Sequence, residues 1–286
     1  MTTPVAYKVL ATDAAPSTIT FAVSFEEAMD LATSGAVAFP GVLPGPLAPF
    51  SPETIQLDQW SPTDIAGCSL WLDPASGVTL DPSTGNIQSW TDRVSGLTLT
   101  APSQARQPSS STLNGQTALQ FTSSSDADPN ASVLSAPAFS STNTAMAFVA
   151  IQEQGGMAGR TEAFILSDSA APANRLGIGQ SGAGGPVWQI DVTTPLQGSA
   201  ANTDPHVLAA DYQNGNLYVD AAADAGPAAI GSAVWSGLVV GCAGDATTFG
   251  FNGLVGDVII YDNPLSASDR LLVESYLSSR YGVPLP

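Results

Sequence analysis

The sequence has 286 residues, 44% of them hydrophobic, with 25 acidic residues against 7 basic ones and a formal net charge of −18. Binding to the nucleic-acid backbone relies on clustered lysine and arginine, so this charge balance argues against nucleic acid and anionic membranes as partners. No apolar run reaches the roughly 18 residues that a membrane-spanning helix needs.

The first 62 residues differ in composition and sequence pattern from the rest. Residues 7–10 and 19–23 resemble two short strands, and residues 24–35 predict a short helix in which Ser24 and Glu27 form a capping box. Prolines at positions 40, 44, 46, 49, 52 and 62 then predict an extended connector. We therefore expect residues 1–62 to form a small α+β or extended attachment arm with a proline-rich linker. No basic segment followed by an apolar one opens the chain, so no signal peptide is expected.

From Ile65 onward the pattern predicts short strands joined by turns. Candidate strands are residues 68–72, 87–92, 117–121, 145–152, 163–167, 187–192, 206–212, 216–219, 238–240 and 254–261. Asn114-Gly115, Asn214-Gly215 and Asn252-Gly253 separate several of them, and Asn-Gly is a strong hairpin signal. The expected fold is all-β: residues 63–286 form a two-sheet antiparallel sandwich.

The chain ends in a strand followed by a capped helix. Leu254, Gly256, Val258 and Ile260 alternate with four other residues, which predicts a strand with one well-buried face. Ser266 and Asp269 resemble a capping box, and apolar residues then recur at helical spacing up to Tyr281, before Gly282.

The two cysteines, Cys68 and Cys242, lie far apart in apolar, strand-like contexts. Two buried, unbridged thiols are the favoured interpretation, because unpaired cysteine is among the most buried residue types. A single disulfide between them stays open.

Five short motifs follow one another in the first half of the β-rich region: Leu70-Trp-Leu-Asp73, Ser89-Trp-Thr-Asp92, Ser95-Gly96, Gln107-Pro108 and Leu113-Asn-Gly-Gln-Thr-Ala-Leu-Gln-Phe121. Together with the ending from Phe251 to Gly282, they resemble the laminin-G-like jelly-roll domains of the concanavalin A-like lectin/glucanase superfamily. The resemblance covers roughly residues 65 to 286. It implies a jelly roll whose concave face or rim loops bind carbohydrate in many relatives, sometimes with Ca²⁺, and which in others is a structural or adhesive module.

The glucanases of that superfamily resemble one another in a Glu-x-Asp-x-x-Glu strand, and none of the six glutamates here is followed two positions later by aspartate. Asp257 and Asp262 lie five positions apart, on opposite faces of a regular strand. The lone histidine, His206, is expected to be a surface or hydrogen-bonded residue. Gly177 to Gly182 matches a dinucleotide-binding pattern by coincidence, because a glycine-rich loop and a strand follow it rather than a helix. We therefore predict no catalytic residues and a protein that is not an enzyme.

Two sets of residues are candidate binding sites. Trp188 and Trp235 are the first candidates for exposed aromatic rings that contact a ligand, with a place in the core as the alternative. Asp126, Asp128 and Asn130 offer alternating oxygen ligands of the kind that Ca²⁺ accepts, with an acidic turn as the alternative. Apart from that Ca²⁺ ion, no cofactor is expected.

These observations favour a non-enzymatic structural protein of a bacteriophage virion: a capsid decoration protein, a head fibre or a tail component. Residues 1–62 would contact other virion proteins, the chain would form a homo-oligomer or a multi-copy assembly, and the jelly roll would be displayed and could bind host-surface glycans. The alternative is a secreted, extracellular or cell-surface carbohydrate-binding or adhesion module. A glycoside hydrolase is the third hypothesis.

Overall fold

The computed structural model describes residues 60–155, 160–168, 176–182, 186–191, 195–228, 234–244 and 246–286. The chain divides into two compact units, Met1–Asp58 and Gln59–Pro286. The predicted attachment arm, with its strands, helix and connector, therefore lies outside the described residues except for positions 60–62. All elements given below belong to the second unit.

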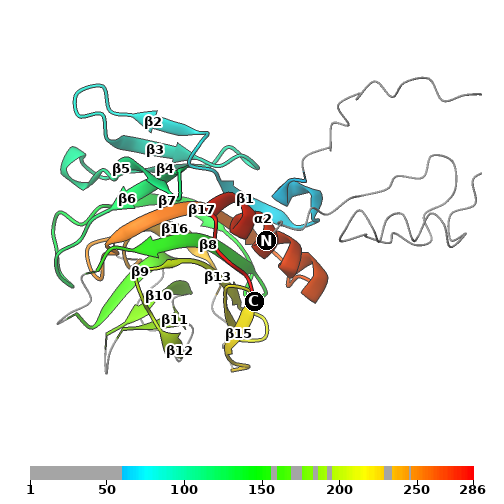
Figure 1. Ribbon diagram of the computed structural model, residues 1–286. Coiled ribbons are helices and arrows are strands. Elements are labelled where there is room, and N and C mark those ends of the chain that lie inside the picture. The colour runs from blue at the N-terminus through cyan, green and yellow to red at the C-terminus, as the bar shows by residue number, and fades with distance from the viewer. Residues whose placement is uncertain are drawn as a thin grey trace, which may run out of the picture. The chain divides into compact units, whose positions relative to one another are not determined.

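The second unit is a sandwich of two antiparallel sheets with a C-terminal helix, as the sequence predicts (Figure 1). The helix-side sheet has the order β15-β14-β13-β8-β17-β6-β5, and β1 also pairs with β17. Its strands are β1 (Cys68–Leu72), β5 (Ser109–Leu113), β6 (Gln116–Phe121), β8 (Met146–Glu153), β13 (Pro205–Asp211), β14 (Asn216–Val219), β15 (Ala222–Ala225) and β17 (Gly253–Tyr261).

The opposite sheet has the order β12-β11-β10-β9-β16-β7-β4-β3-β2. Its strands are β2 (Val78–Leu80), β3 (Ile87–Thr91), β4 (Thr98–Thr100), β7 (Leu134–Ser140), β9 (Glu162–Ser167), β10 (Gly177–Ser181), β11 (Val187–Asp191), β12 (Leu196–Ala200) and β16 (Ser236–Val240). Two short 3-10 helices, η1 (Pro62–Asp64) and η2 (Gln104–Arg106), complete the described elements before the C-terminal helix.

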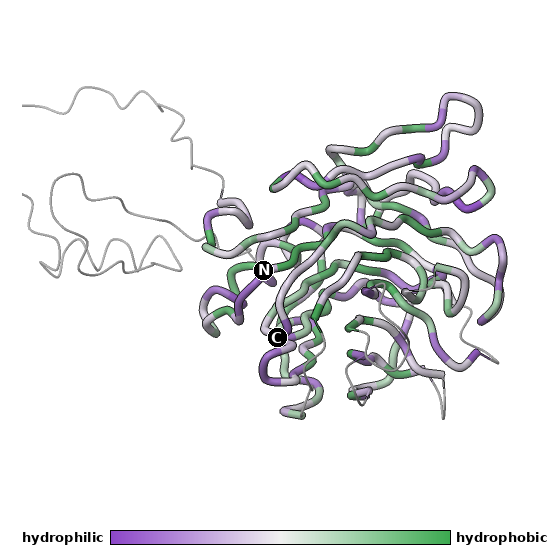
Figure 2. Tube along the Cα trace, turned by 180° about the vertical axis from the view of Figure 1, so that it is seen from behind, coloured by the Kyte–Doolittle hydropathy of each residue, from purple (hydrophilic) through white to green (hydrophobic). Residues whose placement is uncertain are grey.

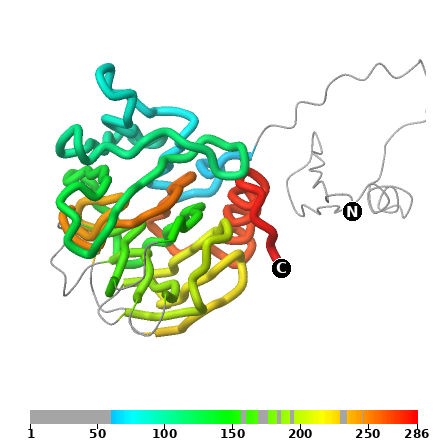
Figure 3. Tube along the Cα trace, turned by 60° about the vertical axis from the view of Figure 1, so that its left-hand side comes forward, coloured from blue at the N-terminus to red at the C-terminus, as the bar shows by residue number. Residues whose placement is uncertain are grey.

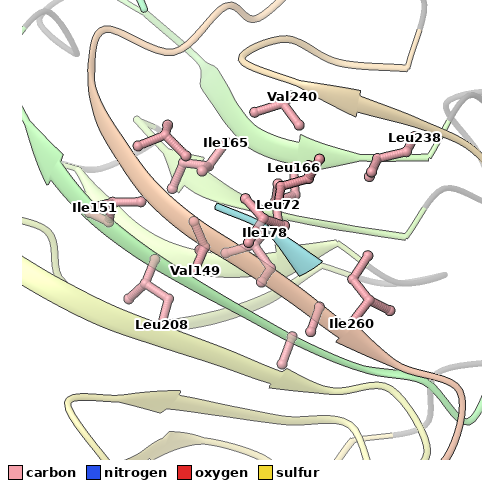
Figure 4. Packing of buried hydrophobic residues seen from close by; sticks show 14 of the residues in the cluster. Leu72, Val149, Ile151, Ile165, Leu166, Ile178, Leu208, Leu238, Val240 and Ile260 are labelled. Atoms are coloured by element: carbon pink, nitrogen blue, oxygen red, sulfur yellow. The ribbon is translucent and has the colours of Figure 1, made fainter. Parts of the chain in front are cut away.

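The main core lies between the two sheets. Val149 and Ile151 of β8 and Leu208 of β13 share one buried cluster with Ile165 of β9 and Ile178 of β10 (Figure 4). Strand residues alternate between the two faces, so one face of β8 enters this cluster and the other faces the helix. Hydrophobic stretches accordingly run along the central strands (Figure 2).

The helix α2 (Ala267–Tyr281) covers the outer face of the helix-side sheet (Figure 3). The amide of Asp269 donates a 3.1 Å hydrogen bond to the Ser266 hydroxyl, and Gly282 ends the helix with a left-handed φ of 64°. Val273, Leu277 and Tyr281 form a second buried cluster with residues of the sheet's outer face. The predicted cap, helix and stop are confirmed.

Strand β17 differs from the prediction in one respect: all nine of its residues are buried. Its register against β8 shifts between Val255 and Val258, where one extra residue forms a β-bulge. Val255 and Val258 therefore both enter the core between the sheets, although regular alternation would place them on opposite faces. The second buried face exists because α2 covers it.

Cys68 and Cys242 are both thiols, as favoured by the sequence, and no disulfide joins them. Cys242 is buried and donates to the carbonyl of Ser132, whereas Cys68 is half-buried. Burial raises the pKa of Cys68 to about 12. In the described part of the chain, no helix combines the length and apolar character needed to cross a bilayer.

Candidate functional site

One end of the sandwich carries a group of polar side chains between the two sheets. Strand β8 ends there, and β13 begins beside it, with Ile151 paired to His206. In the opposite sheet, Gln180 near the end of β10 pairs with Trp188 near the start of β11. We call this group the polar end cluster; its members are Glu153, Gln180, Trp188, Asn202, His206 and Asp220.

Contacts across the sandwich link the members to one another. The side-chain amide of Gln180 donates a 2.9 Å hydrogen bond to Glu153. The rings of Trp188 and His206 meet edge to face, with centroids 5.3 Å apart. Each sheet therefore contributes one polar and one ring-bearing residue, and the two pairs close the gap between the sheets at this end.

Glu153 is the buried carboxyl group of the cluster. Its residue is 6% exposed and its partner Gln180 is 1% exposed. Burial raises the pKa of Glu153, while the hydrogen bond from Gln180 and the charge of Arg160 act in the opposite direction. Glu153 therefore holds a proton at a higher pH than a solvent-exposed glutamate does.

His206 is fixed at both ring nitrogens. Its Nδ1 lies 2.7 Å from Asp220 Oδ2, and its Nε2 lies 3.0 Å from Asn202 Oδ1. That Asn202 oxygen also accepts the amide of Asp204 at 2.7 Å, which identifies the atom as an acceptor. Both ring nitrogens of His206 therefore face an oxygen within the protein.

Asp220 is held in place by the hairpin between β14 and β15. Asp220 and Ala221 have φ of 52° and 68°, the left-handed pair that a two-residue hairpin turn requires. The amide of Val207 donates to Asp220 Oδ1 at 2.8 Å, and the amide of Asp220 donates to the carbonyl of Val207 at the same distance. The carboxylate is therefore oriented toward His206 by the backbone.

The cluster has a buried floor and a rim that reaches solvent. Glu153, Gln180, Trp188 and His206 are buried, Asn202 is exposed, and the Asp220 side chain is 23% exposed. The rim offers the amide of Asn202 and the carboxylate of Asp220, which can donate to and accept from hydroxyl groups of a ligand. His206 already faces Asp220, and neighbouring Arg160 binds Asp126 and the carbonyl of Gly250.

Sequence reasoning singled out two members of this cluster and missed the rest. Trp188 and His206 stood out as rare residue types, and His206 is hydrogen-bonded as expected. Glu153, Gln180, Asn202 and Asp220 gave no signal, because they come from four separate segments that only the sheet pairing brings together. The segment Gly177–Ser181, which matched the dinucleotide-binding pattern, is a strand, β10.

The expectation that Trp188 and Trp235 have exposed rings is corrected: each is 1% exposed. Trp188 lies on the same face of β11 as Ile190, inside the sandwich. Trp235 packs edge to face against Phe139 and Tyr212, with centroids 6.1 and 5.7 Å apart. Both occupy the alternative position in the core, and neither presents a ring face on which a sugar could stack.

The predicted Ca²⁺ ligands form a hydrogen-bonded turn. Asp126 accepts the amide and hydroxyl of Thr161, and Asp128 accepts the amide and hydroxyl of Ser124 and the amide of Asn130. Burial tends to raise the pKa of Asp126, but these donors and Arg160 hold it below its ordinary value. Within the described ranges, no group of three or more His, Cys, Asp or Glu side chains could hold a metal ion. The geometry agrees with the alternative, an acidic turn.

No protein-family model matches the sequence, and neither does any curated protein. Several solved structures are similar in fold. The Trypanosoma rangeli sialidase is 13% identical with a TM-score of 0.49, and the match covers 75% of this chain but 33% of the sialidase. Domain 4 of a GH43 extracellular arabinanase from Geobacillus stearothermophilus, solved with arabinotriose, is 13% identical with a TM-score of 0.45, and the match covers 65% of this chain and 91% of that domain. The CBM40 of a Ruminococcus gnavus sialidase, bound to sialyllactose, is 14% identical with a TM-score of 0.36 over 47% of this chain and 83% of the CBM40.

These comparisons correct the prediction that the chain is not an enzyme. The similar structures include a sialidase, an arabinanase domain and, at 15% identity, a GH54 arabinofuranosidase. The missing Glu-x-Asp-x-x-Glu strand concerns the glucanase type of active site alone. At these identities the likeness concerns the fold alone.

Proposed function

We propose that the sandwich is a carbohydrate-binding domain whose ligand contacts the rim of the polar end cluster. The observation that carries the proposal is the fixed pair of Asp220 and His206, with Asn202 exposed beside it. The oriented amide of Asn202 and carboxylate of Asp220 match the alternating donors and acceptors of a sugar's hydroxyl groups. In this proposal Trp188 packs edge to face against the His206 ring and does not stack on the sugar.

The charge of the protein favours a neutral saccharide. Its formal net charge is −18, and the cluster itself contains two carboxyl groups, Glu153 and Asp220. Because His206 and Arg160 already face acceptors within the protein, a ligand carboxylate or sulfate would meet repulsion with little compensation. Sialylated and uronic-acid-rich glycans are thus disfavoured relative to neutral oligosaccharides.

Replacing Asn202 by Ala should weaken binding of a neutral oligosaccharide about tenfold, which corresponds to about 1.4 kcal/mol. The reason is the loss of an exposed amide that both contacts the ligand and holds His206 through the 3.0 Å contact. A glycan array identifies the oligosaccharide, and isothermal titration calorimetry then compares the variants.

The matched control is Asn263→Ala, because Asn263 is also exposed but follows β17 at the opposite end of the sandwich. It should bind as the unmodified protein does. A blank array, preferential binding of acidic glycans, or equal loss in both variants would each contradict the proposal. Product analysis of the same mixtures shows whether bound oligosaccharides are also hydrolysed.

We further propose that the sandwich is a laminin-G-like domain and that the chain is part of a bacteriophage virion. The layout of the chain favours the second: the sandwich is a compact unit separate from Met1–Asp58, which suits a displayed domain with its own attachment segment. Glycan binding and attachment to a particle are compatible, since the two functions use different units.

Deleting residues 1–60 should leave a folded sandwich that no longer incorporates into particles. Complementation of a particle-forming host with full-length and shortened chains, followed by analysis of purified particles, measures this. Normal incorporation of the shortened chain would refute attachment through the first unit. Secretion of the full chain into medium without particles would favour the extracellular alternative.

A further inference from the structure

Helix α2 is fastened to the sheet at its C-terminal half by a buried carboxyl group. Asp257 of β17 is 0% exposed. Its carboxylate accepts a 2.9 Å bond from Arg280 and a 3.1 Å bond from the Tyr276 hydroxyl, and its amide donates to the Tyr281 hydroxyl at 2.9 Å. Arg280 also binds Asp73, at the end of β1, at 2.6 Å.

A second buried carboxyl group lies in the middle of the helix. Glu274, on α2 itself, is 0% exposed and pairs with Arg270 at 2.5 Å. Arg270 in turn covers the ring of Tyr218 and donates to the carbonyl of Ala221, both on the β14–β15 hairpin. The other carboxylate oxygen of Glu274 is buried without a hydrogen-bond partner in the described structure.

We propose that α2 is a proton-dependent latch, which holds most tightly when Asp257 and Glu274 are protonated and loosens when both ionise. The geometry supports this directly. Each carboxyl group is buried by the docking of the helix. The arginine that contacts it also binds a second acceptor, which is Asp73 for Arg280 and the carbonyl of Ala221 for Arg270. One oxygen of Glu274 has no hydrogen-bond donor in the described structure. Undocking would return both groups to water, where the ionised form costs little.

The direction of the effect follows from the groups that face each carboxyl. Burial raises the pKa of Asp257 to about 7, with Arg280, Tyr276 and Tyr281 opposing and Asp73 adding to the rise. Burial likewise raises the pKa of Glu274 to about 7, with Arg270 opposing and Asp220 adding. The docked state therefore binds protons more tightly than the undocked state, and docking weakens as pH rises from about 4 through about 7. The pKa of Asp73 is lowered despite its burial, so Asp73 changes its protonation only below that pH range.

Hydrogen exchange on the full-length chain tests the proposal. Protection factors of the α2 amides, corrected for intrinsic rates, should fall at least about tenfold between about pH 5.5 and about pH 8.5, while those of β8 change less. In the Asp257→Asn, Glu274→Gln double variant, the α2 protection factors should become independent of pH in this range. Asp128→Asn is the control, because hydrogen bonds hold the pKa of Asp128 below its ordinary value and far from this range.

A measurement on the unmodified protein keeps the test decisive even where the double variant folds poorly. The side-chain carboxyl ¹³C shifts of Asp257 and Glu274 should titrate with midpoints near 7. Midpoints below about 5, as for solvent-exposed carboxyl groups, would overturn the proposal. Protection factors of α2 that stay constant with pH, or a double variant that keeps the pH dependence, would overturn it as well.

Discussion

Replacing Arg280 by Met should lower the free energy of unfolding by about 3–5 kcal/mol at about pH 9, where Asp257 is ionised beside Arg280, because this is the usual cost of removing one partner from a buried ion pair. Arg280 is the guanidinium that lies between Asp73 and Asp257, at 2.6 and 2.9 Å. Its removal leaves Asp257 buried with only tyrosine hydroxyls and backbone beside it. The loss should grow as pH rises, because the carboxyl group escapes the penalty only by keeping its proton. Urea unfolding at several pH values measures this.

Two further variants separate the buried charge from ordinary packing. Arg93 also binds Asp73, at 2.8 Å, but its side chain is 44% exposed, so Arg93→Met should cost about 1 kcal/mol or less. Adding Asp257→Asn to Arg280→Met should recover at least about half of the loss, because the uncompensated charge is then gone. Equal losses for the two arginines, or no recovery in the double variant, would show that the network contributes only packing.

The strands that the sequence predicted each contain two or more large apolar residues. Residues 68–72 and 216–219 match β1 and β14, and Asn114-Gly115 forms the two-residue turn between β5 and β6, with φ of 49° and 82°. The missed strands are short or rich in Ser, Ala and Gly, such as β5, β10 and β15. Such strands are ordered by their neighbours' hydrogen bonds rather than by their own hydrophobic pattern.

The candidate site could not be predicted from the sequence for a related reason. Its members lie in β8, β10, β11, β13 and the turns around Asn202 and Asp220, and only the register between strands brings them to one end. The same limit explains why the burial of Trp188 could not be predicted. Trp188 stands in a strand whose inner and outer faces the sequence does not distinguish, because both faces of β11 are buried from Trp188 to Asp191.

Gly256 shows how one residue determines the position of α2, and its replacement by Ala should cost about 1–3 kcal/mol, the range for overpacking a filled core. A Cβ atom at this position would lie 2.5 Å from Cζ and 2.9 Å from both Cε atoms of the Tyr281 ring. The ring cannot turn aside without breaking the hydrogen bond between its hydroxyl and the amide of Asp257. The helix must therefore shift, and denaturant unfolding with an unchanged m-value should report the loss.

A double-mutant cycle identifies that steric overlap as the cause. Tyr281→Leu alone should destabilise the protein, because it removes a fully buried ring and its hydrogen bond. Once the ring is gone, the added methyl group of Gly256→Ala finds space, so the double variant should lose less than the sum of the two single losses. The bulge of β17 turns Gly256 toward Tyr281 and Asp257 toward Arg280. Gly256 leaves room for the Tyr281 ring, and the carboxyl group of Asp257 binds Arg280, so both residues position the same helix. Strictly additive losses would mean that Gly256 is required by the bulged backbone itself, and not by the helix that lies on it.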